Sequence, residues 1–259
     1  MKHIGTAISA RGLSFSYDLK MPHFMDGLSL DIEEGSVCAI LGPNGSGKTT
    51  LLLLILGMLR PVKGELSIHT VPLQGKHRVP KHLVGLVPQE ESVAFGLSVF
   101  EYVLLGRAPH LGMLEQPGKA DRELAARALD MVGIPHLKSR EVPSLSGGER
   151  QLAMVARVLV QESHIMLMDE PTSHLDLGNT RRILDLIRML RQNGKTVVFS
   201  THDPNAAAAV ADHVILMKKG CILSSGSPAD TLTQEFLSML YGVDVEVASV
   251  KGRPLVVID

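Results

Sequence analysis

Tryptophan is absent from this chain of 259 residues, and only 3 tyrosines and 6 phenylalanines supply aromatic rings. Two cysteines, Cys38 and Cys221, are too few for a disulfide framework, so we expect both to be reduced thiols. An excess of one charge is also missing, because 26 basic and 27 acidic side chains leave a formal net charge of -1. That balance gives no electrostatic signal for binding DNA or RNA, and we expect no nucleic-acid partner.

A hydrophobic run long enough to cross a bilayer is missing as well. The longest apolar segment extends from Leu51 to Leu59, whereas a membrane-spanning helix needs about 20 apolar residues. The start of the chain, from Met1 to Thr6, has no apolar stretch behind a basic end, so we expect no signal peptide. A hydrophobic share of 45% and a charged share of 20% are typical of a globular protein with a large core.

Strand and helix patterns alternate along most of the chain. Buried strands are predicted over Val37–Leu41 and Ile165–Met168, and a further strand over Lys195–Ser200. Helices are predicted over Thr49–Leu59, from near Glu149, and around Ile183–Leu190. This order predicts an α/β fold with a mostly parallel sheet, a small antiparallel β subdomain and an inserted helical subdomain. We expect one domain, in which residues 1–89 and 151–225 form the core, 90–150 the helical subdomain, and 226–259 a helix and hairpin.

A glycine-rich loop follows the first buried strand and precedes a helix. The segment from Gly42 to Thr49 fits the pattern of a glycine, four residues, and Gly-Lys-Thr. Its amides and the helix N-terminus can surround phosphate oxygens, while Lys48 supplies a positive charge and Thr49 a ligand for Mg²⁺. The predicted nucleotide-binding residues of this loop are Gly42, Pro43, Asn44, Gly45, Ser46, Gly47, Lys48, Thr49 and Thr50.

Two adjacent acids end the strand Ile165–Met168. Carboxylates at the carboxyl end of a buried strand lie where ligands bind in open α/β sheets. We therefore expect Asp169 to help hold Mg²⁺ and Glu170 to act as the general base toward water.

The segment Leu145-Ser146-Gly147-Gly148-Glu149 resembles the signature motif of the ATP-binding-cassette (ABC) ATPases. The other motifs of that family occur in the same order along the chain. They are a Q-loop glutamine (Gln89), a D-loop (Ser173–Asp176), a switch histidine (His202) and an adenine-stacking aromatic residue (Tyr17). The similarity runs from about Leu13 to Gly226, which is most of the chain.

The resemblance implies a division of roles. Ser146, Gly147, Gly148 and Glu149 would face the γ-phosphate of ATP bound on a second subunit, so we expect a homodimer around two ATP molecules with Mg²⁺. The catalytic residues would be Glu170, His202, Lys48 and Gln89. The residues that hold Mg²⁺ would be Thr49, Gln89 and Asp169. Tyr17 shares a strand face with Phe15, so either ring could stack on adenine.

The D-loop departs from the family pattern, because His174 stands where a small residue is common. This difference concerns a contact of the dimer and leaves the chemistry untouched.

The resemblance also implies a partner in the membrane. A chain without a span that carries one cassette is typical of the ATPase subunit of an importer, which would lie at the cytoplasmic face of the inner membrane against separate permease subunits. A solute-binding protein would be an indirect partner. The alternative is a soluble ABC ATPase that remodels a protein or nucleic-acid complex.

Two further segments are similar to one importer group. The segment Ser98–His110 and the tail around Tyr241–Val245 resemble ATPases that power import of iron–siderophores, haem, cobalamin or oxyanions. Apolar Val99, Val103 and Leu104 either line a groove for a permease helix or belong to the core of the helical subdomain.

Overall fold

A computed structural model describes residues 5–18, 23–69, 71–73, 79–80, 83–91, 93 and 96–257. They form two compact units, Met1–Val79 with Ile187–Asp259 and Pro80–Leu186, called the first and second unit below. The domain boundaries expected from the sequence stay a prediction. No helix in the described ranges is long and apolar enough to cross a membrane.

A mostly parallel sheet forms the core of the first unit. β3 (Val37–Leu41) is buried at every residue and pairs in parallel with β8 (Thr196–Thr201) and β9 (His213–Lys218). β10 (Cys221–Gly226) pairs antiparallel with β9. Because no face of β3 meets water, an unbroken apolar run forms this strand. The same burial raises the pKa of the Cys38 thiol to about 12, whereas Cys221 is exposed.

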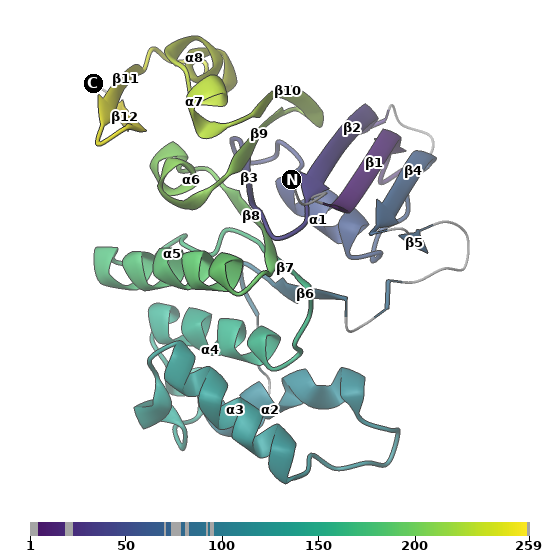
Figure 1. Cartoon of the computed structure of the whole chain (residues 1–259), viewed down its shortest axis with the longest axis vertical. Coiled ribbons are helices and arrows are strands. Elements are labelled where there is room, and N and C mark those ends of the chain that lie inside the picture. The colour runs from purple at the N-terminus through teal and green to yellow at the C-terminus, as the bar shows by residue number, and fades with distance from the viewer. Residues whose placement is uncertain are drawn as a thin grey trace. The chain divides into compact units, whose positions relative to one another are not determined.

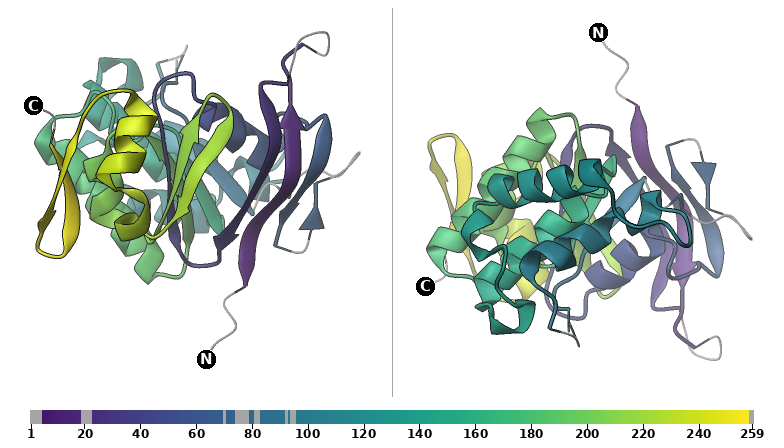
Figure 2. Two further views of the ribbon diagram at one scale, coloured as in Figure 1. Left: turned by 90° about the horizontal axis from the view of Figure 1, so that it is seen from above. Right: turned by 90° about the horizontal axis from the view of Figure 1, so that it is seen from below.

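A second sheet of the first unit is antiparallel, and its strands lie side by side in Figure 2. Its order is β2 (Met25–Glu33), β1 (Thr6–Phe15), β4 (Lys63–Ile68) and β5 (Val71–Pro72). From Leu28 onward β2 buries every second residue, as expected for a strand with one wet face. This sheet is the small antiparallel β subdomain predicted from the sequence.

The helix after the glycine-rich loop is shorter than predicted. α1 extends from Lys48 to Ile55 and not to Leu59. Gly57 adopts a left-handed conformation with φ 75°, and its amide donates to the carbonyl of Leu54. A glycine in this conformation ends a helix, so the chain leaves α1 before the predicted stops at Pro61 and Gly64.

The C-terminal part of the first unit follows β10. It consists of α7 (Pro228–Thr231), α8 (Gln234–Tyr241) and a hairpin of β11 (Glu246–Val250) and β12 (Arg253–Val257). The predicted helix and hairpin are confirmed over these residues, while Ile258 lies outside the described residues. β10 and α7 were not predicted from the sequence.

The second unit combines two parallel strands with packed helices. β6 (Val84–Val87) pairs in register with β7 (Ile165–Met168). α2 (Val99–Leu104), α3 (Lys119–Met131) and α4 (Gly147–Leu159) pack against one another (Figure 1). Short 3₁₀ turns connect them over Leu105–His110, Pro135–Leu137 and Val142–Ser144. α5 (Leu177–Gln192) runs from this unit into the first.

Together these elements confirm the predicted fold class, which is α/β with a parallel-dominated sheet, a small antiparallel sheet and a helical part. The structure also decides the assignment of Val99, Val103 and Leu104, which are all buried. They belong to the core of the helical part, and the interpretation as lining of a permease groove is wrong.

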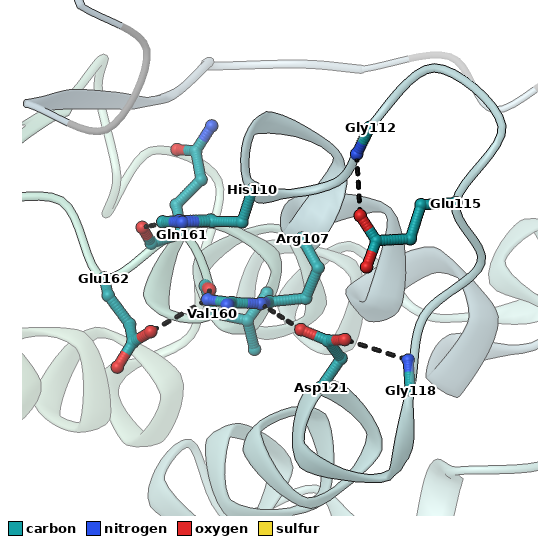
Figure 3. A network of polar contacts seen from close by, with 9 residues as sticks. All are labelled: Arg107, His110, Gly112, Glu115, Gly118, Asp121, Val160, Gln161 and Glu162. Carbon is teal, nitrogen blue, oxygen red and sulfur yellow. Dashed lines mark hydrogen bonds and ion pairs between the residues drawn. The ribbon is translucent and has the colours of Figure 1, made fainter.

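Arg107 is a buried cation that joins three segments of the second unit (Figure 3). Its Nε donates to Oδ1 of Asp121 at 2.7 Å, and its Nη1 donates to the carbonyl of Val160 at 2.7 Å and to Oε2 of Glu162 at 2.8 Å. This guanidinium, followed by the Gly118 amide, holds the pKa of Asp121 below its usual range. The planar guanidinium thus fixes the start of α3 against the end of α4.

We expect Arg107→Met to lower the free energy of unfolding by about 1–3 kcal/mol, because the buried carbonyl of Val160 loses its side-chain donor. Urea unfolding followed by circular dichroism measures the effect. Arg122→Met is the matched control, since Arg122 is exposed on α3, the helix that Arg107 contacts through Asp121. Equal stability of the two variants would contradict the role given to Arg107.

Candidate functional site

The loop between β3 and α1 is formed by residues 42–47 of the first unit. Gly47 has φ 105°, a conformation that residues with a side chain rarely adopt. The Lys48 ammonium is buried and donates to the carbonyls of Gly42 at 2.8 Å and Pro43 at 3.2 Å. These bonds hold its positive charge inside the loop that precedes the N-terminus of α1.

A buried hydroxyl in this loop gives independent support for a phosphate site. Ser46 is 2% exposed, and its Oγ has no hydrogen-bond partner in the described part of the chain. A buried hydroxyl without a partner costs free energy that an acceptor such as a phosphate oxygen would recover. Thr49 is exposed in the first turn of α1, so its hydroxyl is accessible to a metal ion.

The structure separates the two aromatic candidates for adenine stacking. Phe15 is 5% exposed and belongs to the core, whereas Tyr17 is 67% exposed. The two rings are nearly perpendicular at a centroid distance of 4.8 Å, and the hydroxyls of Tyr17 and Thr50 lie 2.6 Å apart. This arrangement favours Tyr17, whose contact with adenine stays a prediction.

Asp169 and Glu170 follow β7 in the second unit, and both carboxylates are buried. The Asp169 amide donates to the carbonyl of Val87, which extends the pairing of β7 with β6 by one residue. Glu170 then turns into the left-handed region with φ 47°, and its carbonyl accepts hydrogen bonds from the amide and the hydroxyl of Ser173. A non-glycine residue held in this conformation is a feature common at functional sites.

The signature segment begins α4 with a complete capping box. The Ser146 hydroxyl accepts from the Glu149 amide at 3.3 Å, and the Ser146 amide donates to Oε2 of Glu149 at 2.8 Å. The bond from the Ser146 amide, followed by an interaction of the Ser146 hydroxyl with the same carboxylate, holds the pKa of Glu149 below its usual range. Ser146 and Gly147 are exposed at this helix N-terminus, where amides and the helix dipole favour an anion.

Gly148 lies in a close contact that the sequence did not reveal. A Cβ at this position would lie 2.4 Å from Nδ2 of Asn179, in the first turn of α5. Asn179 is held in turn by Asp176, which accepts from its backbone amide at 2.7 Å and from its side chain at 3.1 Å. The D-loop and the signature helix are therefore packed together.

The second unit also contains a cavity of about 430 Å³. It brings together Gln89, the α4 residues Gly147 and Gln151, and the D-loop residue His174. Gln151 is 6% exposed, and its Nε2 has no hydrogen-bond partner among the described residues. Helical spacing alone marked this face of α4 as apolar, so sequence reasoning missed Gln151. His174 has φ 58°, so the residue that departs from the family pattern also has an unusual backbone conformation.

His202 directly follows β8 in the first unit and is exposed. Its neighbour Asp203 caps α6 (Pro204–Val210) by accepting from the Asn205 amide at 2.8 Å. The Asp203 amide donates to Oγ1 of Thr201 at 3.0 Å. Short-range bonds therefore fix the backbone on the C-terminal side of the histidine.

The predicted site residues divide between the two units. The first carries Tyr17, the loop residues up to Thr50, and His202, and the second carries Gln89, the signature residues, Asp169 and Glu170. Among the described residues, no group of three or more His, Cys, Asp and Glu side chains could hold a metal ion alone.

Comparison with known proteins assigns the chain to a family. Residues 25–173 match the family described as ABC transporter, which is more than half of the chain. The chain is 39% identical to the molybdate import ATP-binding protein of Haemophilus influenzae over 236 residues, which cover 91% of this chain and 88% of the relative. It is also 39% identical to the hemin import ATP-binding protein of Myxococcus xanthus over 235 residues, with 88% and 87% covered.

The fold agrees with this assignment. A solved metal-chelate type ABC transporter in an inward-facing conformation superposes with a TM-score of 0.86 at 36% identity, covering 98% of this chain and 97% of that chain. The protein belongs to the ABC transporter family and is a transport-coupled ATPase that binds ATP with Mg²⁺.

The capping box predicts a pH dependence of stability. Because the pKa of Glu149 is lowered in the folded state, its charge stabilises the fold above the pKa of the unfolded chain, and this contribution is lost as the pH falls through the folded pKa. We expect Glu149→Gln to be less stable than the wild type at pH 7, with a difference that shrinks below about pH 4.3.

Urea unfolding at pH 7 and pH 3 checks this difference. Glu123→Gln is the matched control, since Glu123 lies exposed on α3 with only a 4.0 Å contact to Lys119. A difference between wild type and Glu149→Gln that stays constant with pH would contradict the charge effect.

Proposed function

We propose that this chain is the ATPase subunit of an importer for a metal chelate or a related oxyanion, acting on a separate membrane permease. The main support for this proposal is the similarity to hemin and molybdate import subunits, which extends over nearly the full length at 39% identity. The likeness to a solved metal-chelate type transporter extends over the C-terminal hairpin as well, since 98% of the chain is covered.

The first unit supplies the binding of phosphate in this proposal. The buried ammonium of Lys48 and the amides of residues 42–47 neutralise the phosphate oxygens, and the Ser46 hydroxyl finds its missing acceptor there. Tyr17 stacks on adenine, since its ring is exposed beside Phe15.

Hydrolysis needs groups that direct water and balance charge. Glu170 accepts the proton of the attacking water, and its backbone is held by two bonds from Ser173. Thr49, Gln89 and Asp169 are the proposed ligands of Mg²⁺, which when bound neutralises charge on the phosphates. His202 contacts the γ-phosphate as the switch histidine. These roles rest on the motifs and on the local geometry of each residue.

Two copies of the chain share each nucleotide. Ser146 and Gly147 are exposed at the N-terminus of α4, which suits an anion, and Gly148 follows them in the first turn. Lys48 already binds the phosphates of its own subunit, so this second anion site acts on the ATP of the other subunit. ATP then closes the dimer and hydrolysis opens it, and the permease responds to that motion at the cytoplasmic face of the membrane.

We expect Glu170→Gln to bind ATP while its turnover falls about 10²–10⁴-fold, because the general base is lost. ATP should then hold a dimer, seen by light scattering as a mass near twice 28.0 kDa. The control is the double variant Lys48→Ala/Glu170→Gln, which should stay monomeric with ATP. A monomer of Glu170→Gln under saturating ATP would refute the shared site.

Reconstitution tests the cargo class. The chain, its permease and the carrier protein are placed in proteoliposomes and offered labelled haem, cobalamin, ferric siderophore and molybdate against a sugar and an amino acid. We expect ATP-dependent uptake from the first set, and none with Lys48→Ala in place of the wild type.

Uptake of the sugar or the amino acid alone would refute the cargo class and leave the ATPase intact. Absence of any uptake, together with tight binding to ribosomes or DNA, would instead favour a soluble ATPase that remodels such a complex.

A further inference from the structure

The C-terminal part of the first unit is attached to the segment that carries His202. α8 packs on β9 and β10 and buries Leu237 and Leu240, while β12 packs on α6. α8 then ends at Tyr241, because Gly242 takes a left-handed conformation with φ 75°. The last residue of this helix is therefore placed by a rigid, buried support.

Tyr241 makes a direct polar contact with the segment of His202 and Asp203 that follows β8, called the switch segment below. Its hydroxyl donates to the backbone carbonyl of His202 at 2.8 Å. The two residues lie 39 positions apart in the sequence, so the bond ties the C-terminal helix to the end of β8. Because α8 is anchored by its buried leucines, the hydroxyl approaches the carbonyl from a fixed direction.

Two further contacts hold the residues that follow. The side-chain amide of Asn205 pairs with both backbone groups of Val256 in β12, at 3.0 Å and 2.8 Å. Arg253 donates to the carbonyl of Ala209, at the other end of α6, at 3.1 Å. The hairpin thus holds α6, and Tyr241 binds the peptide group that directly follows the histidine.

The orientation of that peptide group constrains the backbone that carries the imidazole. The carbonyl of His202 defines the plane of the bond to Asp203, whose amide is already fixed by Thr201. A hydrogen bond to the carbonyl therefore limits rotation about the backbone of His202 itself. Small displacements of a catalytic group are costly, since about 1 Å of misplacement can lower a rate 10²-fold.

We infer that Tyr241 is a positioning residue for ATP hydrolysis, and that through its hydroxyl the C-terminal helix sets the orientation of His202. The inference rests on the role of His202 at the γ-phosphate proposed above. Because the Tyr241 hydroxyl contacts the backbone of His202, we expect it to act on kcat and to leave the affinity for ATP unchanged. A purely structural role for Tyr241 makes the opposite prediction, namely lower stability with an unchanged kcat.

Tyr241→Phe isolates the hydroxyl, because the ring and its packing are kept. We expect kcat of the purified full chain to fall about fivefold, the effect of losing one net hydrogen bond. KM for Mg-ATP should stay within error of the wild-type value. An unchanged kcat would overturn the inference.

Thr231→Val is the matched control. Thr231 is buried in the same C-terminal part, and its hydroxyl also donates to a backbone carbonyl, that of Ser227 at 2.8 Å. It has no contact with the switch segment among the described hydrogen bonds. Its kcat should equal the wild-type value whatever its Tm. An equal loss of kcat in both variants would mean that any weakening of the C-terminal part slows turnover, which overturns the inference.

A double-mutant cycle with His202→Ala tests whether the hydroxyl acts through the histidine. Single-turnover rates with excess enzyme are measured for both single variants and for Tyr241→Phe/His202→Ala. We expect Tyr241→Phe to have no further effect once the imidazole is gone. The same fold-loss in both backgrounds would overturn the inference.

The role of His202 and the positioning role of Tyr241 can fail separately in these experiments. If His202→Ala is slow while Tyr241→Phe is normal, the positioning role is wrong and the proposed role of His202 stands. If His202→Ala keeps full turnover, the proposed role of His202 is wrong, and the inference built on it falls as well.

Discussion

Backbone crowding around the glycine-rich loop is the constraint on which the first unit depends. A Cβ on Gly42 would lie 2.2 Å from the carbonyl oxygen of Met217 in β9, and one on Gly47 would lie 2.8 Å from Cε of Met25. Gly42 therefore lies against the main chain of β9, the parallel neighbour of β3. β8 also pairs in parallel with β3, and His202 is the first residue after β8.

Single polar side chains connect distant segments in both units. Arg107 joins two helices of the second unit through carbonyl and carboxylate oxygens, and Asn205 pairs with the backbone of β12 in the first. Apolar packing alone tolerates small shifts between elements, whereas such directional contacts do not.

The sequence predicted elements whose signals are local. The strand over Ile165–Met168 and the loop before Lys48 were placed correctly, because an apolar run and a glycine pattern each occupy one short window. β10 was missed because it is a half-exposed edge strand. The burial of Val99 depends on packing against α4, and the contact of Gly148 with Asn179 joins two helices. No pattern within a single window encodes such contacts.

The two cysteines differ in their exposure to solvent, and therefore in their reactivity toward thiol reagents. Cys38 lies inside the parallel sheet, and burial raises the pKa of its thiol to about 12. Since the thiolate is the reactive form, this residue is inert to alkylating reagents at neutral pH. Cys221 is exposed at the start of β10. A maleimide dye added to the folded wild-type protein therefore labels one position of known location, without any cysteine being removed or introduced.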